Sequence, residues 1–350
     1  MRRKGYKLLA LLATGVCLMG ALTGCGSLKQ KYTADEAKAL EVMKVGEETV
    51  TADELYLYAI QCCYMYGLDE KTAVESLSTY KSAILEQIQS AKAKYQVALT
   101  ADIEINEEEE KEIDETVDRF YETYSEELFD AYGISRDAVR QLFVEQRYIT
   151  KLQDKAMTDL TADYMKEAHE QFDDKRFIEL YYVTFPISST DENGAEVAFT
   201  DDQKAEQKKK AEEFRQKVID GGSIEEMAAE LGDTVVADTQ RTFVGIYKED
   251  LNNILETLEN GEVSTIYEDE SGYMVMQMKN KNDTEYKDFF IEAYANQEAQ
   301  NAYTQMESVW VGSMPVEEDD FIGDTWEKMT LVDIARYMAK NNMSINATEE

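Results

Sequence analysis

The sequence predicts an α+β fold, because helical segments flank a central stretch that also contains strands. Apolar residues recur every three or four positions over much of the chain, as in amphipathic helices, and only Pro186 and Pro315 are present to interrupt them. Between residues 177 and 282, alternating apolar positions indicate a strand at each end of the stretch. The 350 residues exceed one typical domain, so we expect two or three structural units.

The N-terminus has the form of a secretory signal. Basic residues from Arg2 to Lys7 precede an apolar run from Leu8 to Leu22, which is too short for a typical transmembrane span. The run ends at Leu22-Thr23-Gly24-Cys25, which resembles the lipobox of bacterial lipoproteins. This resemblance implies lipid attachment at Cys25, and two acyl chains give stable membrane anchoring. An ordinary signal peptide with a coincidental cysteine is the alternative.

The segment that follows is predicted to be mainly helical. Val42 to Gly46 indicates a brief strand and turn, and Thr51-Ala-Asp-Glu54 has the spacing of a helix capping box. Asn106 precedes an acidic helix whose first turn, Glu107 to Glu110, suits the helix dipole. Four consecutive glutamates point around a helix, so we interpret them as a solvated helix start rather than a calcium site. A further helix is expected from Arg136 to about Asp159.

Few side chains suit nucleophilic or metal chemistry. The one histidine, His169, has no second histidine or cysteine near it in the sequence, so we expect an exposed polar position. Cys62 and Cys63 are adjacent, and a bridge between them would be strained. We interpret them as buried thiols that pack as small hydrophobes, with an intermolecular disulfide as the alternative. The sequence predicts no metal site and no cofactor.

The charge balance restricts the class of partner. The net charge is −36, from 72 acidic and 36 basic residues. Such a chain would be repelled by phosphate backbones, which argues against nucleic-acid binding. The acidity favours solubility and cationic partners without specifying a fold.

The central stretch has clear boundaries between its predicted elements. Phe177 to Phe185 alternates like a half-buried strand, and Asn193-Gly194 marks a turn. Thr200-Asp-Asp-Gln203 is a capping box for one helix, and Ser223-Ile-Glu-Glu226 caps a second, shorter one. The final strand follows the glycine turn at Gly261.

This order of elements resembles the parvulin domain of peptidyl-prolyl isomerases. The segments that carry the resemblance are Gly222-Ser-Ile-Glu-Glu-Met-Ala228, Phe243-Val-Gly245, Asn260-Gly-Glu-Val-Ser264 and Ser271-Gly-Tyr273. The resemblance implies a small antiparallel sheet with helices. Its framework residues here would be Gly222, Phe243, Gly245, Gly261, Gly272 and Tyr273.

With the lipobox and the flanking helices, the whole chain resembles extracytoplasmic foldase lipoproteins of the PrsA/SurA type. In that family the N-terminal arm and the C-terminal helix form one chaperone module, into which the parvulin domain is inserted. A helical stripe from Tyr286 to Trp310 is the expected partner of the arm. The predicted organisation is a signal peptide (1–24), a tether (25–32), a helical chaperone module (33–176 with 283–340), a parvulin-like domain (177–282) and a disordered tail (341–350).

The chain departs from active parvulins at the residues that matter for catalysis. The family places one histidine in the first strand, where this chain has Tyr182, or Tyr181 if the register is shifted by one residue. It places another after the final glycine–aromatic pair, where this chain has Met274. The acidic or thiol residue of the family corresponds to Asp233 or Asp238, and the loop that follows is predicted to be shortened to residues 238–243.

We therefore predict no catalytic histidine and weak or no isomerase activity. Isomerisation must cross a barrier of roughly 18–20 kcal/mol but requires no covalent chemistry. An apolar pocket that twists the amide is sufficient in principle, so an active peptidyl-prolyl isomerase is the alternative.

The predicted function is that of a foldase or chaperone, lipid-anchored on the extracytoplasmic side of the cell membrane. Its predicted partners are unfolded or nascent secreted polypeptides, and the membrane through the lipid anchor. A scaffold lipoprotein with one dedicated partner is a further alternative. The sequence leaves open whether the chain forms a homodimer.

Overall fold

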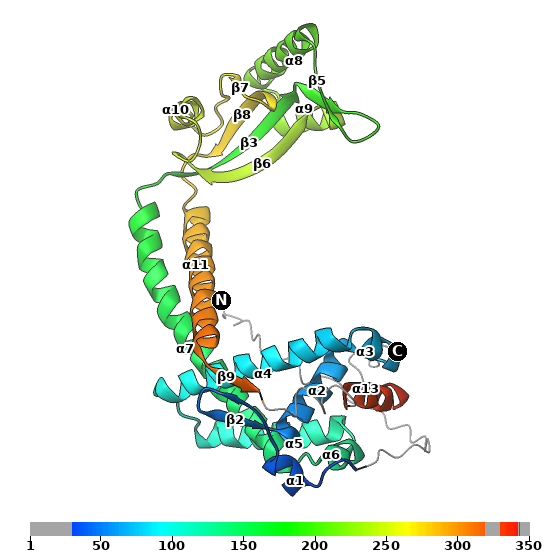
Figure 1. The fold of residues 1–350 in the computed structure, drawn as a ribbon. Coiled ribbons are helices and arrows are strands. Elements are labelled where there is room, and N and C mark those ends of the chain that lie inside the picture. The colour runs from blue at the N-terminus through cyan, green and yellow to red at the C-terminus, as the bar shows by residue number, and fades with distance from the viewer. Residues whose placement is uncertain (1–29, 319–329, 342, 344–350) are drawn as a thin grey trace. The chain divides into compact units, whose positions relative to one another are not determined.

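The computed structural model of the protein describes residues 30–318, 330–341 and 343 (Figure 1). The chain divides into two units. Unit 1 comprises Met1–Asp159 and Asn301–Glu350, and unit 2 comprises Leu160–Gln300. Two long helices, α7 (Arg136–Phe172) and α11 (Thr284–Ser313), each contribute residues to both units. Helix α7 therefore continues well past Asp159, where the sequence pattern predicted its end.

Several sequence predictions fall on residues that the structure does not describe. The signal peptide and Cys25 are among them, as is most of the predicted tail. In the part of the chain that is described, no helix combines the length and the apolar character that a membrane span requires.

Unit 1 is built mainly from helices around a small sheet. Its elements are α1 (Ala34–Ala39), β1 (Glu41–Val45), β2 (Glu48–Thr51), α2 (Ala52–Tyr66), α3 (Glu70–Glu75), α4 (Leu77–Thr100), α5 (Glu107–Thr123), α6 (Glu126–Tyr132), the first part of α7, the last part of α11, β9 (Val316–Glu318) and α13 (Thr330–Lys340). The predicted strand and turn at Val42 to Gly46 are confirmed, because this segment supplies β1. Strand β1 pairs antiparallel with both β2 and β9.

Helix α2 lies in the core of unit 1. Its residues from Leu55 to Ile60 are each at most 2% exposed, so the helix is enclosed on every side. Helix α13, from the far end of the chain, packs against α2 and α3. It buries Leu331, Ile334 and Met338 in the same core. The C-terminal segment thus completes a core that the N-terminal segment begins.

The prediction for the two cysteines is confirmed, since Cys62 and Cys63 are buried free thiols. The Sγ atom of Cys63 lies 3.8 Å from the carbonyl oxygen of Leu331 in α13. Burial raises the pKa of Cys62 to about 11. Burial, followed by the neighbouring thiol, also raises the pKa of Cys63. Both groups are therefore protonated and shielded while α13 is in place.

Replacing Ile334 by aspartate is expected to detach α13 and make both thiols reactive. Ile334 is fully buried, and an unpaired carboxylate at that position carries a large desolvation cost. The measurement is the rate at which a disulfide reagent labels residues 26–350, which contain no other cysteine. Ala339→Asp adds the same charge at an exposed position of α13 and should label as slowly as the parent. Slow labelling of a folded Ile334→Asp variant would show that α13 is not the cover.

The predicted capping box at Thr51 and Glu54 is wrong. Thr51 is the N-cap of α2, but its side chain donates to Asp53 Oδ1 at 2.6 Å and makes no cap bond. The Glu54 carboxylate lies 2.7 Å from the Nζ atom of Lys92 in α4. The same ammonium lies 2.8 Å from Glu145 Oε1 in α7. A buried ammonium attracts a carboxylate more strongly than a helix-end amide does, so Glu54 turns into the core.

This cluster gives unit 1 a predicted pH dependence. Burial is the main cause that raises the pKa of Glu54 to about 7; Glu145 raises it further, while Lys92 lowers it. The ordinary value is 4.5, so the folded state holds this proton more tightly than the unfolded state. Protonated Glu54 therefore stabilises the folded state of unit 1 by about 3 kcal/mol below about pH 4.5. This contribution is lost as the pH rises through about 7.

Glu54→Gln should therefore flatten the dependence of unit 1 stability on pH between about 4.5 and 7. The measurement is urea unfolding followed by tryptophan fluorescence, because Trp310, one of the chain's two tryptophans, belongs to unit 1. Glu86→Gln, at an exposed position of α4, should leave the parent's slope intact. If the slope of unit 1 stability against pH is unchanged in Glu54→Gln, Glu54 is not the source of this pH dependence.

Unit 2 is organised around an antiparallel sheet in which the strand order is β6-β3-β8-β7. Its elements are the end of α7, β3 (Phe177–Pro186), β4 (Ser188–Thr190), β5 (Glu196–Ala198), α8 (Asp201–Ile219), α9 (Ile224–Leu231), a 3-10 turn (Gly232–Thr234), β6 (Val236–Phe243), α10 (Glu249–Thr257), β7 (Tyr267–Glu268), β8 (Gly272–Asn280) and the start of α11. Helices α8 and α9 pack on one face of the sheet, and α10 packs on the other. The predicted caps at Thr200 and Ser223 are confirmed.

One loop prediction in this unit is wrong. Residues 238–243, expected to form a shortened loop, belong to strand β6. They pair along β3 from Tyr182–Asp238 to Phe177–Phe243 without a shift of register. Threonines and a terminal phenylalanine suit a pleated strand, and pairing with β3 outweighs the polar character that suggested a loop.

An aromatic cluster joins the helices of unit 2 to its sheet. Phe177, the first residue of β3, lies 5.2 Å from Phe243 and 5.3 Å from Phe290, measured between ring centroids. Phe172, near the end of α7, contacts the same two rings at 5.6 and 5.1 Å. Asp283 begins α11 by donating its N–H to Phe177 O at 2.8 Å. The two ends of the stretch 177–282 therefore lie side by side.

Candidate functional site

The face of the sheet that carries α10 contains the positions at which the sequence predicted family histidines. Residues opposite one another in antiparallel strands point to the same face. Tyr182 lies opposite Asp238 of β6 and Met276 of β8. Met274 lies two residues along β8 and so is a diagonal neighbour of Tyr182. Both Tyr182 and Met274 pack on the core formed with α10 and are half-buried.

The strand register shows on which face each of the alternative residues lies. Tyr181 lies on the opposite face, where Lys279 Nζ is 5.8 Å from its ring centroid. Asp233 lies in the 3-10 turn before β6. Tyr182 and Asp238 are therefore the residues that share one face with Met274.

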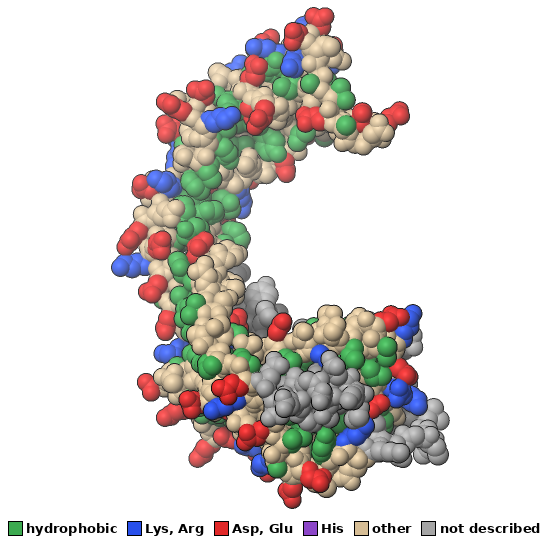
Figure 2. All heavy atoms as spheres, in the orientation of Figure 1, with side chains coloured by type: hydrophobic (Ala, Val, Ile, Leu, Met, Phe, Trp, Pro, Cys, Tyr) green, Lys and Arg blue, Asp and Glu red, His purple; other side chains and the backbone are tan. Residues whose placement is uncertain are grey.

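The surface around these residues is largely apolar. Ile254 of α10 and Tyr247 also pack on this core. Val236, opposite Thr184, is 56% exposed, and Ile246 beside Tyr247 is 58% exposed. Figure 2 shows that hydrophobic side chains reach the surface of this unit among acidic ones. A surface of this kind can hold an apolar side chain of an extended polypeptide.

Sequence reasoning missed a polar chain at the same face. Gln240 Nε2 donates to Tyr247 Oη at 3.0 Å, and Tyr247 Oη donates to Thr242 Oγ1 at 2.9 Å. Gln240 and Thr242 follow Asp238 at intervals of two, so the strand period could have revealed them once β6 was known to be a strand. These two hydrogen bonds hold the Tyr247 ring beside the apolar surface.

The predicted framework residues lie at turns and strand ends around this sheet. Gly272 begins β8 with a φ of +145°, and a Cβ atom there would collide with the carbonyl oxygen of Phe185. Tyr273 points to the opposite face, where Lys208 Nζ lies 5.7 Å from its ring centroid. Phe243 ends β6 in the aromatic cluster. Gly222 precedes α9, while Gly245 and Gly261 stand in turns.

The chain's one histidine takes no part in this face. His169 lies on α7, where its side chain is half exposed and its Nδ1 is 3.1 Å from Asp173 Oδ1. The prediction of an exposed polar position is confirmed. The face around Tyr182 therefore offers aromatic, aliphatic and thioether contacts with one carboxylate, but no imidazole for proton transfer.

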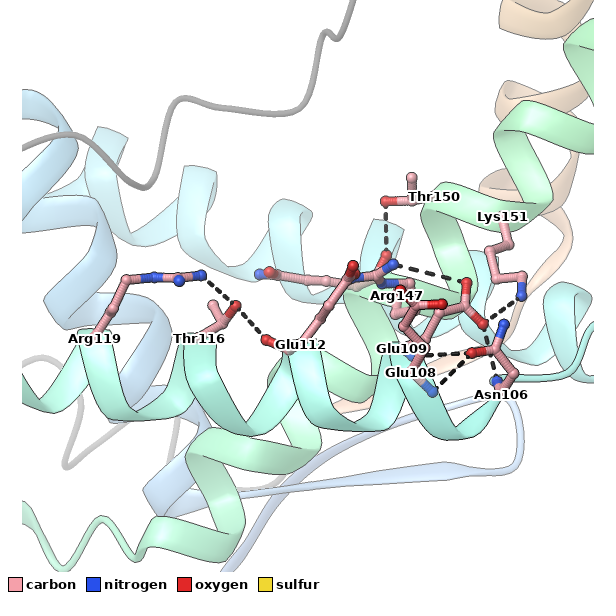
Figure 3. A network of polar contacts seen from close by, with 10 residues as sticks. Asn106, Glu108, Glu109, Glu112, Thr116, Arg119, Arg147, Thr150 and Lys151 are labelled. Atoms are coloured by element: carbon pink, nitrogen blue, oxygen red, sulfur yellow. Dashed lines mark hydrogen bonds and ion pairs between the residues drawn. The ribbon is translucent and has the colours of Figure 1, made fainter.

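The acidic start of α5 was the other candidate site, and the prediction of a merely solvated start is only partly correct. Asn106 caps the helix and forms a capping box with Glu109 (Figure 3). Glu109 Oε2 also lies 2.7 Å from Lys151 Nζ of α7, and Glu110 pairs with Arg140. Basic side chains of α7 thus form ion pairs with Glu109 and Glu110. Within the described residues, no group of acidic, histidine or cysteine side chains is arranged to hold a metal ion.

A cavity of about 660 Å³ opens on the face of the sheet opposite Tyr182. It lies between the end of β3, the β4–β5 hairpin, α8 and α9. Phe185, Phe199 and Phe214 supply its apolar lining, and Lys210 and Glu213 stand among its polar groups. Asp233 lines this cavity rather than the face of Tyr182.

Comparison with known proteins finds similarity to a foldase. No family model matches it. The chain is 21% identical over 291 residues to the foldase protein PrsA of Clostridium tetani, covering 77% of this chain and 81% of that protein. It is a relative of the PrsA-type foldases. The PrsA/SurA resemblance of its sequence is thereby confirmed. The predicted α+β fold class is confirmed by the helices and small antiparallel sheets of the structure.

Solved PrsA structures are also similar to this chain. The foldase protein PrsA of Lactococcus lactis is 14% identical, with a TM-score of 0.36, and the match covers 81% of this chain and 97% of that one. PrsA of Bacillus subtilis is 19% identical, with a TM-score of 0.26, and the match covers 84% and 100%.

Proposed function

We propose that the chain is a membrane-anchored extracytoplasmic foldase that binds unfolded or nascent secreted polypeptides. The sequence similarity to PrsA supports the foldase role, and the signal-like N-terminus with its lipobox supports the location. The observation that carries the proposal is the face around Tyr182 and Met274, where half-buried Tyr182 and Met274 lie beside the exposed apolar side chains of Val236 and Ile246. Such a face favours binding over acid–base chemistry.

A client with exposed apolar residues would gain contacts with this face that folded proteins do not offer. Met274 is adaptable in shape, and Tyr182 combines apolar area with a polar tip. The exposed side chains of Val236 and Ile246 extend the apolar area to the margin of the sheet. Binding there lowers the concentration of aggregation-prone segments without requiring any chemical step.

Delayed aggregation of an unfolded client is the test of this role. Residues 26–350 are expected to delay the aggregation of a denatured secreted protein on dilution. Met274→Glu should weaken the delay, because it places a charge in the apolar face. Val197→Glu adds the same charge at a position on β5 that is 48% exposed and should act like the parent. The proposal fails if the parent neither delays aggregation nor binds an unfolded client.

We further propose that the sheet unit has weak or no isomerase activity. The twisted amide must still be stabilised against a barrier of roughly 18–20 kcal/mol. Asp238, opposite Tyr182, is the feature that favours the alternative of an active isomerase, since the sequence resemblance makes it a candidate for the family's acidic residue. A protease-coupled assay on peptides with an X-Pro bond decides between them. The parent should match the buffer rate, and Tyr182→His with Met274→His should exceed it; a fast parent would establish the alternative.

Lipid anchoring is proposed at Cys25. In cells that express the full chain, the protein should fractionate with membranes and incorporate a radiolabelled fatty acid. Cys25→Ala should lose the label, whereas Cys17→Ala should keep it, because Cys17 would be removed with the signal. Retention of the label in Cys25→Ala would refute this attachment site.

A further inference from the structure

The outer edge of strand β6 is open in the part of the chain that the structure describes. β6 is the terminal strand of its sheet and pairs with β3 alone (Figure 1). Proteins commonly blunt such edges with very short strands or bulges. The opposite edge follows this rule, because β7 consists of Tyr267–Glu268 only. β6 instead runs over Val236–Phe243 without a shift of register, which is long enough to accept another strand.

The register shows which backbone groups of β6 face outward. Val244 N–H donates to Arg176 O at 3.0 Å, so these residues form a hydrogen-bonded pair. Hydrogen-bonded and non-hydrogen-bonded pairs alternate along an antiparallel ladder. Asp238 and Gln240 therefore direct their backbone groups toward β3, while Ala237, Thr239 and Arg241 direct theirs outward. Among the described residues, the outward N–H groups of Ala237 and Arg241 have no hydrogen-bond partner.

The outward amide at the centre of the edge is occupied by a carboxylate. Thr239 N–H donates to Asp238 Oδ1 at 2.7 Å. Asp238 is exposed and has no ion-pair partner within the described part of the chain. Arg241 is already paired, because its guanidinium lies 3.4 Å from carboxylate oxygens of both Glu179 and Asp283. The edge therefore carries one uncompensated negative charge beside Tyr182.

These charges distinguish between the strands that could add to the edge. A second copy of this chain would bring another Asp238 and a further net charge of −36, which opposes self-pairing. A basic segment would instead be attracted to this acidic edge. We propose that β6 binds an extended, lysine- or arginine-containing segment of a client by antiparallel strand addition. This inference rests on the proposed function and names the class of client segment that the sheet unit selects.

In this arrangement, the Asp238 carboxylate occupies the Thr239 N–H until a client segment displaces it. A client residue opposite Asp238 stands in a non-hydrogen-bonded pair, where Cα atoms are about 4.5 Å apart and side chains are closest. A lysine at that place pairs with the carboxylate and draws it from Thr239 N–H. The released amide then donates to the client backbone, as in other cases of strand addition. The client chain is thereby placed along the margin of the face that contains Tyr182.

Selective backbone methylation of a peptide tests this arrangement. The probe is a fluorescein-labelled peptide of about ten alternating lysine and threonine residues, a typical strand length at most. With lysines opposite Asp238, the threonine amides face β6 and the lysine amides face away. Fluorescence anisotropy with the full-length chain in detergent should show that methylating the threonine amides weakens binding by about ten-fold or more, which is about 1.4 kcal/mol. Methylating the lysine amides should change binding little.

Two protein variants complete the test. Asp238→Asn should remove the preference for this peptide over its glutamate–threonine counterpart, while strand pairing to β3 continues. Thr239→Pro removes the outward N–H without touching a bond to β3 and should weaken binding of both peptides; circular dichroism reports whether the sheet persists. If Thr239→Pro unfolds the sheet, comparing the two methylated peptides on the parent protein still tests strand addition.

Equal binding of the two methylated peptides would overturn strand addition. A dimer in light scattering that the peptide does not dissociate would assign the edge to a second copy and also overturn the proposal. The aggregation assay separates these failures from that of the proposed function. A chain that delays aggregation but ignores the methylation pattern is a foldase without this edge site. A chain that shows the pattern but no delay retains the edge site and loses the proposed function.

Discussion

Replacing Lys92 by methionine is expected to destabilise unit 1 by about 3–5 kcal/mol, because it leaves buried carboxylates without their cation. Lys92 is 3% exposed and lies within 2.8 Å of both Glu54 and Glu145. Glu145 is 2% exposed, and its second carboxylate oxygen has no hydrogen-bond partner within the described residues. The measurement is urea unfolding followed by tryptophan fluorescence, which reports on unit 1 through Trp310.

The loss should be larger near pH 7 than near pH 5. Without the ammonium, the Glu54 carboxylate stays buried and loses its cation, so its protonated form is favoured further. Acidification then restores part of the stability by neutralising Glu54. Combining Lys92→Met with Glu54→Gln and Glu145→Gln should recover much of the loss, because the charges that need the lysine are gone.

The control is a lysine two residues along the same helix. Lys94 pairs with Glu307 at 2.6 Å, but both side chains are partly exposed. Lys94→Met should therefore cost about 1 kcal/mol or less. If Lys92→Met and Lys94→Met lower the free energy of unfolding equally, burial does not determine how much the Lys92 cluster contributes to stability.

The second large effect is expected from Phe177→Ala in unit 2, at about 3–5 kcal/mol. Phe177 is 1% exposed and packs against Phe243 and Phe290. Removing its ring opens a cavity at the place where β3 begins and α11 starts. The measurement is the unfolding transition seen by far-ultraviolet circular dichroism but not by tryptophan fluorescence, because Trp310 belongs to unit 1.

A phenylalanine on α11 provides the matched control. Phe289 is 65% exposed, although it precedes the partly buried Phe290 in sequence. Phe289→Ala should change stability by no more than about 0.5 kcal/mol. A weakened delay of client aggregation in Phe289→Ala, with stability unchanged, would instead identify this ring as a contact for clients. Equal destabilisation by the two variants would contradict the placement of the cluster.

The proposed division of labour in the sheet unit follows from where its residues lie. The cluster around Phe177 holds the sheet to its helices, and the face around Tyr182 is left to contact other molecules. Neither set includes an imidazole. The relation to PrsA foldases therefore does not require that this chain retain isomerase activity.

The parts of the fold that depend on neighbouring residues in the chain were predictable. The caps at Thr200 and Ser223 are confirmed, because a hydroxyl reaches the amides of the next turn within a few residues. The strand predicted from Phe177 to Phe185 is confirmed, although helices pack on both faces of β3, so it is not half-buried as the alternation suggested. The burial of Cys62 and Cys63 follows in the same way from their helix, which is apolar around its circumference.

Predictions that depended on distant partners failed or stayed open. Thr51 and Glu54 have the spacing of a capping box, but Lys92, nearly forty positions away, removes the glutamate from it. Residues 238–243 look like a polar loop until β3 supplies a partner strand. The outward amides of β6 and the polar chain through Tyr247 have no signature in sequence, because they follow from strand order and register.

The sequence by itself determined the α+β class, the resemblance to PrsA/SurA foldases and the absence of histidines from a parvulin-like stretch, because composition, periodicity and short motifs record these directly. Only the tertiary structure decided that Tyr182 and Asp238, rather than Tyr181 and Asp233, share a face with Met274. The physical reason is the strand period: a register shift of one residue moves every side chain to the other face of the sheet, and the register is fixed by pairing with distant strands.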